Sequence, residues 1–196
     1  MTRIPLLDPH AQAASRITGQ GYVLVPNGGI GDNVARDLVE DLTPFPREGG
    51  LLFVGEACSP WPSSHLDPSH PMYLPPRWRA AGEHKTGGRW RAARTLPEHM
   101  ARSRFRVLAR SALRLGDVTE EMASGMGIER AETPRHLRDV LEPAYLGPVT
   151  ATDLRDGCYM YTIREALDAF RAWWPLWTKQ PYNPASWVFI AHVERL

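Results

Sequence analysis

The sequence predicts a loop-rich α+β protein, and three observations support this fold class. The chain has 196 residues with eighteen prolines and sixteen glycines, which is more typical of a loop-rich β protein than of a helical bundle. Residues 104–115 alternate between apolar and polar side chains with the period of a strand. Residues 163–174 instead place their apolar side chains on one face of a helix. This length is sufficient for one well-buried domain, or for two very small ones.

The first third of the chain predicts two strands and one short helix. Residues 1–20 show no clear pattern, so we expect a poorly ordered or loosely packed N-terminal arm. The run 21–25 predicts a strand that ends at an Asn-Gly-Gly turn. A short helix follows, capped by Asp32 or Asn33, and a continuous apolar strand covers 51–57. The apolar positions of that helix are Val34, Leu38 and Leu42.

Residues 58–100 have no sustained periodicity, and we interpret them as a long loop excursion from one domain that covers 21–196. Loops of this length inside a compact domain are usually functional or mobile. Two short helices follow. The first is capped by Thr119, or by Asp117 with Glu120 in a capping box, and the second covers 134–141.

The last forty residues predict a strand, a helix and a closing strand. The short strand covers 158–162. The helix 163–174 begins at a capping box made by Thr162 and Glu165 and ends at Pro175. The closing strand 187–193 is apolar on both faces, so we expect a central strand with both faces covered. Its first face carries Trp187, Phe189, Ala191 and Val193, and its second face carries Val188 and Ile190.

Composition excludes several classes of protein. No apolar run is long enough to predict a transmembrane helix, so we expect no membrane partner. The N-terminus lacks the hydrophobic core of a secretory signal. The two cysteines, Cys58 and Cys158, give no disulfide framework, which favours a reducing cytoplasm. Cys58 and the histidines of the excursion match no compact zinc pattern, so we expect no metal.

The segment 77–114 is strongly basic. It holds eleven cations and two anions, a local balance of +9 in a chain whose net charge is +1. Within it, the strand 104–115 predicts an apolar face and a ladder of guanidiniums that suits phosphate or carboxylate. The alternative is a solvated outer face of a sheet. The ladder comprises Arg104, Arg106, Arg110 and Arg114, opposite Phe105, Val107, Ala109, Leu113 and Leu115.

Other side chains of the same region are candidates for a binding site. Trp78 and Trp90 alternate with arginines, so they are placed to stack on bases or to form lids over a barrel mouth. Glu56 ends an otherwise apolar strand and must be paired or face a cavity; a structural partner for an arginine is the alternative. The predicted nucleic-acid-binding set is Arg77, Arg79, Arg89, Arg91, Arg102, Arg104, Arg106, Arg110, Trp78 and Trp90.

The order of several segments resembles a known family. The segments are His99-Met100, Ser103-Arg104, residues 115–128, Leu176-Trp177, and Asn183-Pro184 with the closing strand. Upstream, residues 49–57 are similar to the family's Gly-Asp-x-Leu-Trp-Val-Arg-Glu segment. From His99 to its end the chain thus resembles small bacteriophage and prophage proteins related to the ASCH domain, within the PUA-like superfamily.

This resemblance implies a fold and a class of ligand. The family fold is a small, partly open β-barrel with flanking helices, and the ligands are nucleic acids or modified nucleosides, with no cofactor, inside a bacterial host cell. Some relatives are amidohydrolases of acylated cytidine that use a lysine in a Gly-x-Lys-Thr-x-Thr-type segment and a glutamate on the following strand. Here the corresponding segment, residues 31–37, has no lysine, and Arg36 keeps its proton and cannot act as a base. Lys85 is the only lysine besides Lys179.

Three functions from different classes follow. The first is a non-catalytic module that binds nucleic acid or a modified nucleobase through residues 77–114, with Glu56 contacting a base edge in the barrel mouth. The second is a hydrolase of acylated cytidine or RNA, with Glu56 as general acid and base and Lys85 brought in from the excursion. The third is a phage protein that binds and inhibits, or scaffolds, another protein through its excursion and exposed aromatic side chains.

Overall fold

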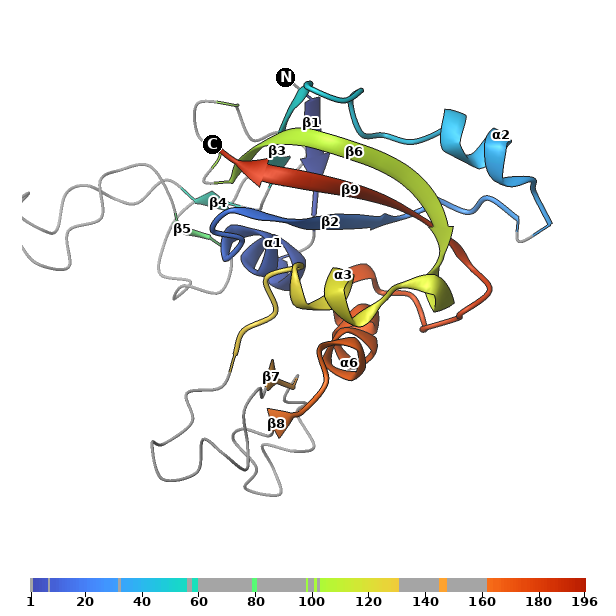
Figure 1. The fold of residues 1–196 in the computed structure, drawn as a ribbon. Helices are drawn as coiled ribbons and strands as arrows, with labels where there is room; N and C mark the ends of the chain where they lie inside the picture. Colours follow the sequence, from blue (N-terminus) through green and yellow to red (C-terminus); the bar gives the residue numbers. More distant parts are fainter. Residues whose placement is uncertain are drawn as a thin grey trace, which may run out of the picture.

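The structure is a computed structural model, and it describes residues 2–6, 8–31, 33–55, 58–59, 79–80, 98, 101, 103–130, 145–147 and 162–196. Figure 1 shows a curved sheet with helices α1 (Asp8–Ser15), α3 (Glu120–Ser124) and α6 (Ala166–Thr178) on one side of it. Helix α2 (Arg36–Asp41) lies apart from these three and packs against the longest strand. The described part of the chain is therefore a mixed α+β fold, which confirms the predicted class.

Five strands of the described residues form the main sheet, in the order β1-β3-β6-β9-β2. They are β1 (Thr2–Pro5), β2 (Gln20–Pro26), β3 (Leu51–Gly55), β6 (Arg104–Arg114) and β9 (Trp187–Arg195). Strands β1 and β3 pair in parallel, and all other neighbours pair antiparallel. The described strands form a mostly open sheet with β1 and β2 at its edges, and they do not close into a barrel.

Two short strand pairs lie outside this sheet. One joins β4 (Cys58–Ser59) to β5 (Arg79–Ala80), and the other joins β7 (Tyr145–Leu146) to β8 (Thr162–Ile163). The rest of the predicted excursion 58–100, the predicted helix 134–141 and residues 158–161 of a predicted strand lie outside the described residues, apart from isolated positions. Within the described residues, no helix combines the length and the apolar character needed to cross a bilayer.

The core is divided between the two faces of the sheet. A first cluster contains residues from all five strands, including Ile4 of β1 and Val25 of β2. The sheet therefore curls enough for its two edge strands to contribute to one core. A second cluster covers the other face, where Leu24 and Ile190 pack with the buried side of α6, including Phe170. Burial of apolar surface on both faces is the main driving force for this arrangement.

Strand β9 is central, as the sequence predicts. It pairs with β6 on one edge and with β2 on the other. Trp187, Phe189, Ala191 and Val193 belong to the first core cluster, whereas Val188 and Ile190 belong to the second. The continuous apolar run arises because both faces of this strand are covered.

The N-terminal segment is not a loosely packed arm, and this corrects the sequence prediction. Residues 2–5 form strand β1, which pairs with β3. Ala11 and Ala14 of α1 and the following Ile17 are buried in the first core cluster. The prediction failed because an eight-residue helix whose buried positions are mostly alanine has a weak apolar pattern, although small side chains allow close packing.

A β-bulge divides strand β6, and it also overturns a prediction. The register with β9 shifts between Val107 and Ala109, where one extra residue enters β6. Before the bulge, Phe105 and Val107 belong to the first core cluster. After it, Ala112 takes that side and Leu113 packs with the second cluster. An inserted residue reverses the alternation of side chains.

The predicted single ladder of arginines is therefore wrong. Arg104 and Arg106 lie on the face of the second cluster, because Arg106 is paired with Glu194, two residues from His192 and four from Ile190 along β9. Arg110 and Arg114 pair with Ala191 and Trp187 and lie on the opposite face.

Three local predictions about helices also need correction. Pro175 lies inside α6 instead of ending it, and Lys179 follows as a left-handed C-cap. The side chain of Glu165 makes no cap hydrogen bond to α6. In α2 the buried residue is Val39, whereas Leu38 and Leu42 are about 60% exposed. The predicted cap at Thr119 is confirmed, because its Oγ1 accepts a hydrogen bond from Met122 N.

Candidate functional site

Three of the ten residues predicted to bind nucleic acid have described side chains, namely Arg104, Arg106 and Arg110. Arg79 is described only as part of β5. The other predicted residues lie outside the described part of the chain. They are Arg77, Arg89, Arg91, Arg102, Trp78 and Trp90, together with the two catalytic candidates Glu56 and Lys85.

Arg104 and Arg106 are held by weak, partly exposed contacts. Arg104 Nη2 donates to the carbonyl oxygen of Glu98 at 3.2 Å. Arg106 Nη1 lies 3.6 Å from Glu194 Oε2 on β9. Exposed ion pairs of this kind contribute little to stability. An incoming anion therefore competes with Glu194 at small cost.

The arginines on the opposite face are tied to the backbone. Arg110 Nη1 donates to the carbonyl oxygen of Phe45. Arg114 Nη1 donates to the carbonyl oxygen of Ala185 at 2.6 Å, and its guanidinium lies 3.8 Å from the ring centroid of Trp187. Stacking on an indole face stabilises a guanidinium and also covers Trp187. Arg114 is thus mainly a structural residue.

A cavity of about 440 Å³ lies against the middle of the sheet, and we call it the sheet cavity. Strands β2, β6 and β9 contribute residues to it, and α2, α3 and the turn before α3 contribute the others. Its size falls in the range typical of small-ligand sites. It is lined by Tyr22, Arg36, Ala109, Arg110, Ser111, Leu113, Asp117, Met122, Ile190 and His192.

The bulge in β6 makes room for this cavity. Because the alternation reverses after Val107, the side chains of Ala109 and Ser111 come to the face that carries His192 and Ile190. Both side chains are short, so they leave space above the sheet. An uninterrupted strand would have placed Arg110 on this face instead.

An aromatic pair forms one side of the sheet cavity. Tyr22 of β2 and His192 of β9 are direct cross-strand partners. Their rings are stacked, with centroids 4.9 Å apart and planes 23° from parallel. Both side chains are half-buried. Stacked partners restrict each other's rotation, so the pair offers a rigid surface to a planar ligand.

Two glycines allow β2 to approach the end of α3 and thereby position Tyr22. The backbone nitrogen of Tyr22 donates to the carbonyl oxygen of Gly125 at 3.0 Å. A Cβ at Gly125 would lie 2.8 Å from Tyr22 Cδ2, and one at Gly21 would lie 2.4 Å from Gly125 O. Neither distance is tolerated by real side chains. Glycine at both positions is therefore required by the close approach.

On the other side of the cavity, three side chains form a hydrogen-bond network that holds the guanidinium of Arg36 in place. Arg36 Nε donates to Glu40 Oε1 at 2.8 Å, and Arg36 Nη2 donates to Ser111 Oγ at 3.0 Å. Ser111 Oγ in turn donates to Glu40 Oε1 at 3.2 Å. The hydrogen bond from Arg36 is the main cause that lowers the pKa of Glu40. The carboxylate is thus ionised at neutral pH and holds Arg36 against the sheet.

This arrangement suits binding of a planar anionic group. Arg36 supplies a guanidinium beside Ser111, and Tyr22 with His192 supplies aromatic surface. Asp117 contributes a carboxylate that accepts from an amino or ring N–H group. Among the described residues, no group of three or more histidine, cysteine, aspartate or glutamate side chains is placed to hold a metal ion.

Sequence analysis did not identify most of this site. Tyr22 and His192 lie 170 positions apart, and their stacking depends on the register of β2 with β9. The sequence brings Arg36 forward only as a residue that cannot replace a catalytic lysine. The one available signal was the closing strand, whose single polar residue among apolar ones is His192. A polar side chain in a central strand needs a partner or a cavity.

The chain was compared with protein-family models, with curated proteins and with solved structures, and none of the three comparisons gave a match.

Proposed function

We propose that this protein binds nucleic acid or a modified nucleobase, and that the sheet cavity receives one base with its phosphate. The observation that carries this proposal is the stacked Tyr22–His192 pair beside Arg36 in a single cavity. Single-stranded nucleic acids are bound in this way, by aromatic side chains that stack on bases and by cations that follow the backbone. The resemblance of the sequence to ASCH-like proteins supports the same class of ligand.

The second part of the proposal is a path for the phosphates. Arg36 lines the cavity, and Arg104 and Arg106 lie further along β6 on the face that forms its floor. Each guanidinium has five N–H donors, so one contact within the chain leaves donors for a phosphate oxygen. Weak pairing of Arg106 with Glu194 lets a phosphate replace the carboxylate.

We further propose that the sheet is a PUA-like barrel opened between β1 and β2. Two observations support this. The two edge strands contribute Ile4 and Val25 to one core cluster, and they line a common cavity. The opening therefore lies between the edges that a closed barrel would pair.

The proposal is tested by binding of labelled single-stranded and double-stranded oligonucleotides as salt is raised. We expect affinity to fall steeply as salt is raised. Replacing Arg104, Arg106 and Arg110 by alanine should make the slope of the logarithm of the binding constant against the logarithm of salt concentration shallower by about 2. Tyr22→Leu keeps an apolar side chain but removes the stack, so it should cost about 1–3 kcal/mol of binding without changing the slope.

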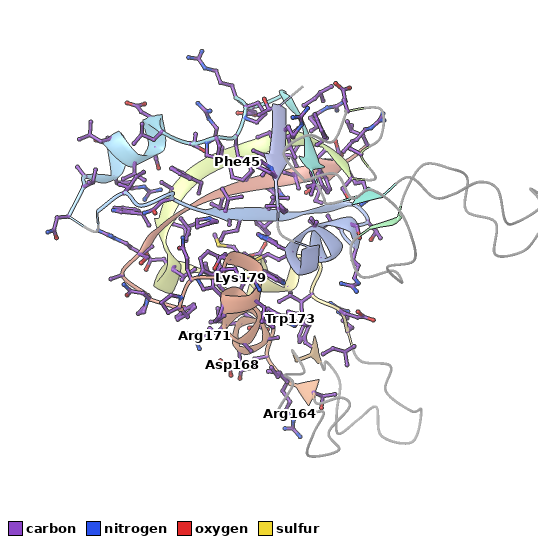
Figure 2. The ribbon with its side chains drawn as sticks, turned by 180° about the vertical axis from the view of Figure 1, so that it is seen from behind. Phe45, Arg164, Asp168, Arg171, Trp173 and Lys179 are labelled. Carbon is purple, nitrogen blue, oxygen red and sulfur yellow. The ribbon has the colours of Figure 1, made fainter. Side chains whose placement is uncertain are left out.

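A matched control removes the same charge elsewhere. Arg16, Arg164 and Arg171 replaced by alanine give an equal change in net charge. Figure 2 shows Arg164 and Arg171 at the α6 side of the molecule, well away from Phe45. This control should bind as the parent does. Equal losses in both triple variants would show non-specific attraction, and no binding at low salt would refute the proposal.

The two alternative functions are outcomes of the same set of experiments. A hydrolase would release product from acylated cytidine or RNA, and Glu56→Gln would abolish that release. A protein that inhibits or scaffolds another protein would bind no oligonucleotide at any salt concentration and would show no product.

A further inference from the structure

A second cavity lies between the two edge strands of the sheet, and we call it the edge cavity. It measures about 300 Å³. Ile4 and Leu6 line it from the β1 side, Val25 from β2, and Trp177 from α6. None of its lining residues is shared with the sheet cavity. The walls are mostly apolar, which is the usual character of a small-ligand site.

One buried polar side chain, His10 of α1, lines the edge cavity. It is only 4% exposed. Its ring stacks on Trp177, with centroids 4.6 Å apart and planes 3° from parallel. Within the described residues, no hydrogen bond to either ring nitrogen is found. A buried polar group without a partner is costly, and native structures normally satisfy such groups with protein, water or ligand.

The protonation state of His10 defines what it can bind. Burial lowers its pKa to about 3, so the ring is neutral at physiological pH. A neutral imidazole has one N–H donor and one nitrogen acceptor. It therefore matches a hydroxyl or a ring N–H group, and it does not supply the positive charge that would attract an anion.

Two other polar side chains of the lining differ from His10 in exposure or in pairing, since Arg3 is exposed and Thr178 is hydrogen-bonded within the chain. The Arg3 guanidinium lies 5.5 Å from the centre of the Phe53 ring. The hydroxyl of Thr178 donates to the carbonyl oxygen of Trp174 at 2.9 Å and accepts from Gln180 N at 3.2 Å. Among the buried side chains of the described lining, His10 offers both a donor and an acceptor, whereas the indole of Trp177 offers a donor alone.

We propose that the edge cavity binds a small uncharged aromatic molecule that carries one hydroxyl or ring N–H group, with His10 as its hydrogen-bonding partner. The flat Trp177–His10 stack, the apolar walls and the volume fit a ligand of one or two rings. This site is separate from the proposed nucleic-acid interface, so either proposal can fail without the other.

The test uses the full-length protein with isotope-labelled histidine, observed by NMR. The chain has seven histidines, and His10 is identified as an imidazole that stays neutral between pH 5 and 8. The probes are phenol and indole, with toluene and benzoate as controls. We expect phenol and indole to shift the His10 ring signals. Both should bind at least about tenfold more tightly than toluene, a difference of about 1.4 kcal/mol in binding free energy. Their affinities should be the same from pH 5 to pH 8.

Two variants test whether the His10 side chain, and not the cavity as a whole, gives the preference for phenol. In His10→Phe the preference for phenol over toluene should disappear, whereas Tyr22→Leu in the sheet cavity should leave it unchanged. Benzoate that binds more tightly than phenol would assign the site to anions and overturn the proposal. If none of the probes shifts the His10 signals in the parent protein, water alone occupies the cavity and the proposal is wrong. That last measurement does not depend on any variant being folded.

Discussion

Individual side chains on β6 are positioned before any ligand arrives. Arg104 contacts a backbone carbonyl, Arg106 a carboxylate, and Arg110 the carbonyl of Phe45. Long side chains lose rotational entropy when they are immobilised by a ligand. Contacts within the chain reduce that loss. Under the proposed function these contacts affect both stability and affinity, so each affinity of an alanine variant must be read with a stability measurement beside it.

Titration of the single residue His10 should make the free energy of unfolding depend on pH. Its pKa in the folded protein is about 3, whereas the ordinary value is 6.5. Between these values the unfolded chain binds more protons than the folded chain, so stability falls as pH is lowered from 6.5 towards 3. At pH 5 the expected loss from this group is about 2 kcal/mol relative to pH 7.5.

Urea unfolding of the parent and of His10→Phe at pH 7.5 and pH 5 measures this loss. The variant has no group to protonate at this position, so its stability should decrease by about 2 kcal/mol less over the same interval. An identical pH dependence in both proteins would mean that His10 titrates normally and is not buried.

At the scale of elements, α6 depends on a side chain from another helix. The first backbone N–H groups of a helix have no partners within it. Here Glu120 of α3 accepts from Ala166 N at 2.6 Å and from Leu167 N at 2.8 Å. Its negative charge also lies at the positive end of the helix dipole.

Further along α6, Pro175 has no backbone N–H and so removes one hydrogen-bond donor from the helix. The helix nevertheless continues, because Trp177 is buried in the second core cluster.

Removal of this remote cap should weaken α6. Glu120→Ala leaves two N–H groups without a partner and should cost about 0.5–2 kcal/mol of unfolding free energy. Glu121→Ala is the matched control, since it removes the same side chain from the adjacent exposed position of the same helix. Chemical denaturation of the two variants gives the comparison, and equal stabilities would contradict a capping role.

Sequence reasoning succeeded where the signal is local. The alternation of β6, the apolar runs of β3 and β9 and the stripe of α6 lie within single segments, so their types were predicted. The bulge near Val107, the cap from Glu120 to Ala166 and the Tyr22–His192 stack depend on pairing between distant segments. For this reason the arginine ladder was predicted on one face and most of the sheet cavity was missed.

At the scale of the whole molecule, β9 joins the two core clusters. It is hydrogen-bonded to β6 and β2 along its length and separates the first cluster from the second. A change in this strand therefore affects both faces of the sheet. Trp187 is the largest side chain of β9. It is 7% exposed, and its Nε1 donates to the carbonyl oxygen of Val34 at 3.1 Å.

Trp187→Ala should remove a large part of the total stability. The loss of a buried tryptophan costs about 3–5 kcal/mol, which approaches the stability of a typical domain. We expect insoluble or molten protein, judged by lost near-ultraviolet circular dichroism and a non-cooperative thermal transition. Trp173→Ala is a useful comparison, because that side chain is only half-buried. A Trp187→Ala protein that melts within a few degrees of the parent would show that β9 is not central to stability.

The unequal lengths of β3 and β6 have a consequence for self-association. Strand β3 pairs with residues 104–106 of β6, and Gly49 and Gly50 pair with Val107, so no strand of the described residues lies along this edge of β6 after the bulge. A bare strand edge is a template for adding another chain and promotes aggregation. Here Glu40 accepts a backbone hydrogen bond from Ala112, and Arg110 reaches across to Phe45. Helix α2 and the segment after it thus cover part of this edge, and covering an edge is one way in which native sheets avoid edge-to-edge pairing.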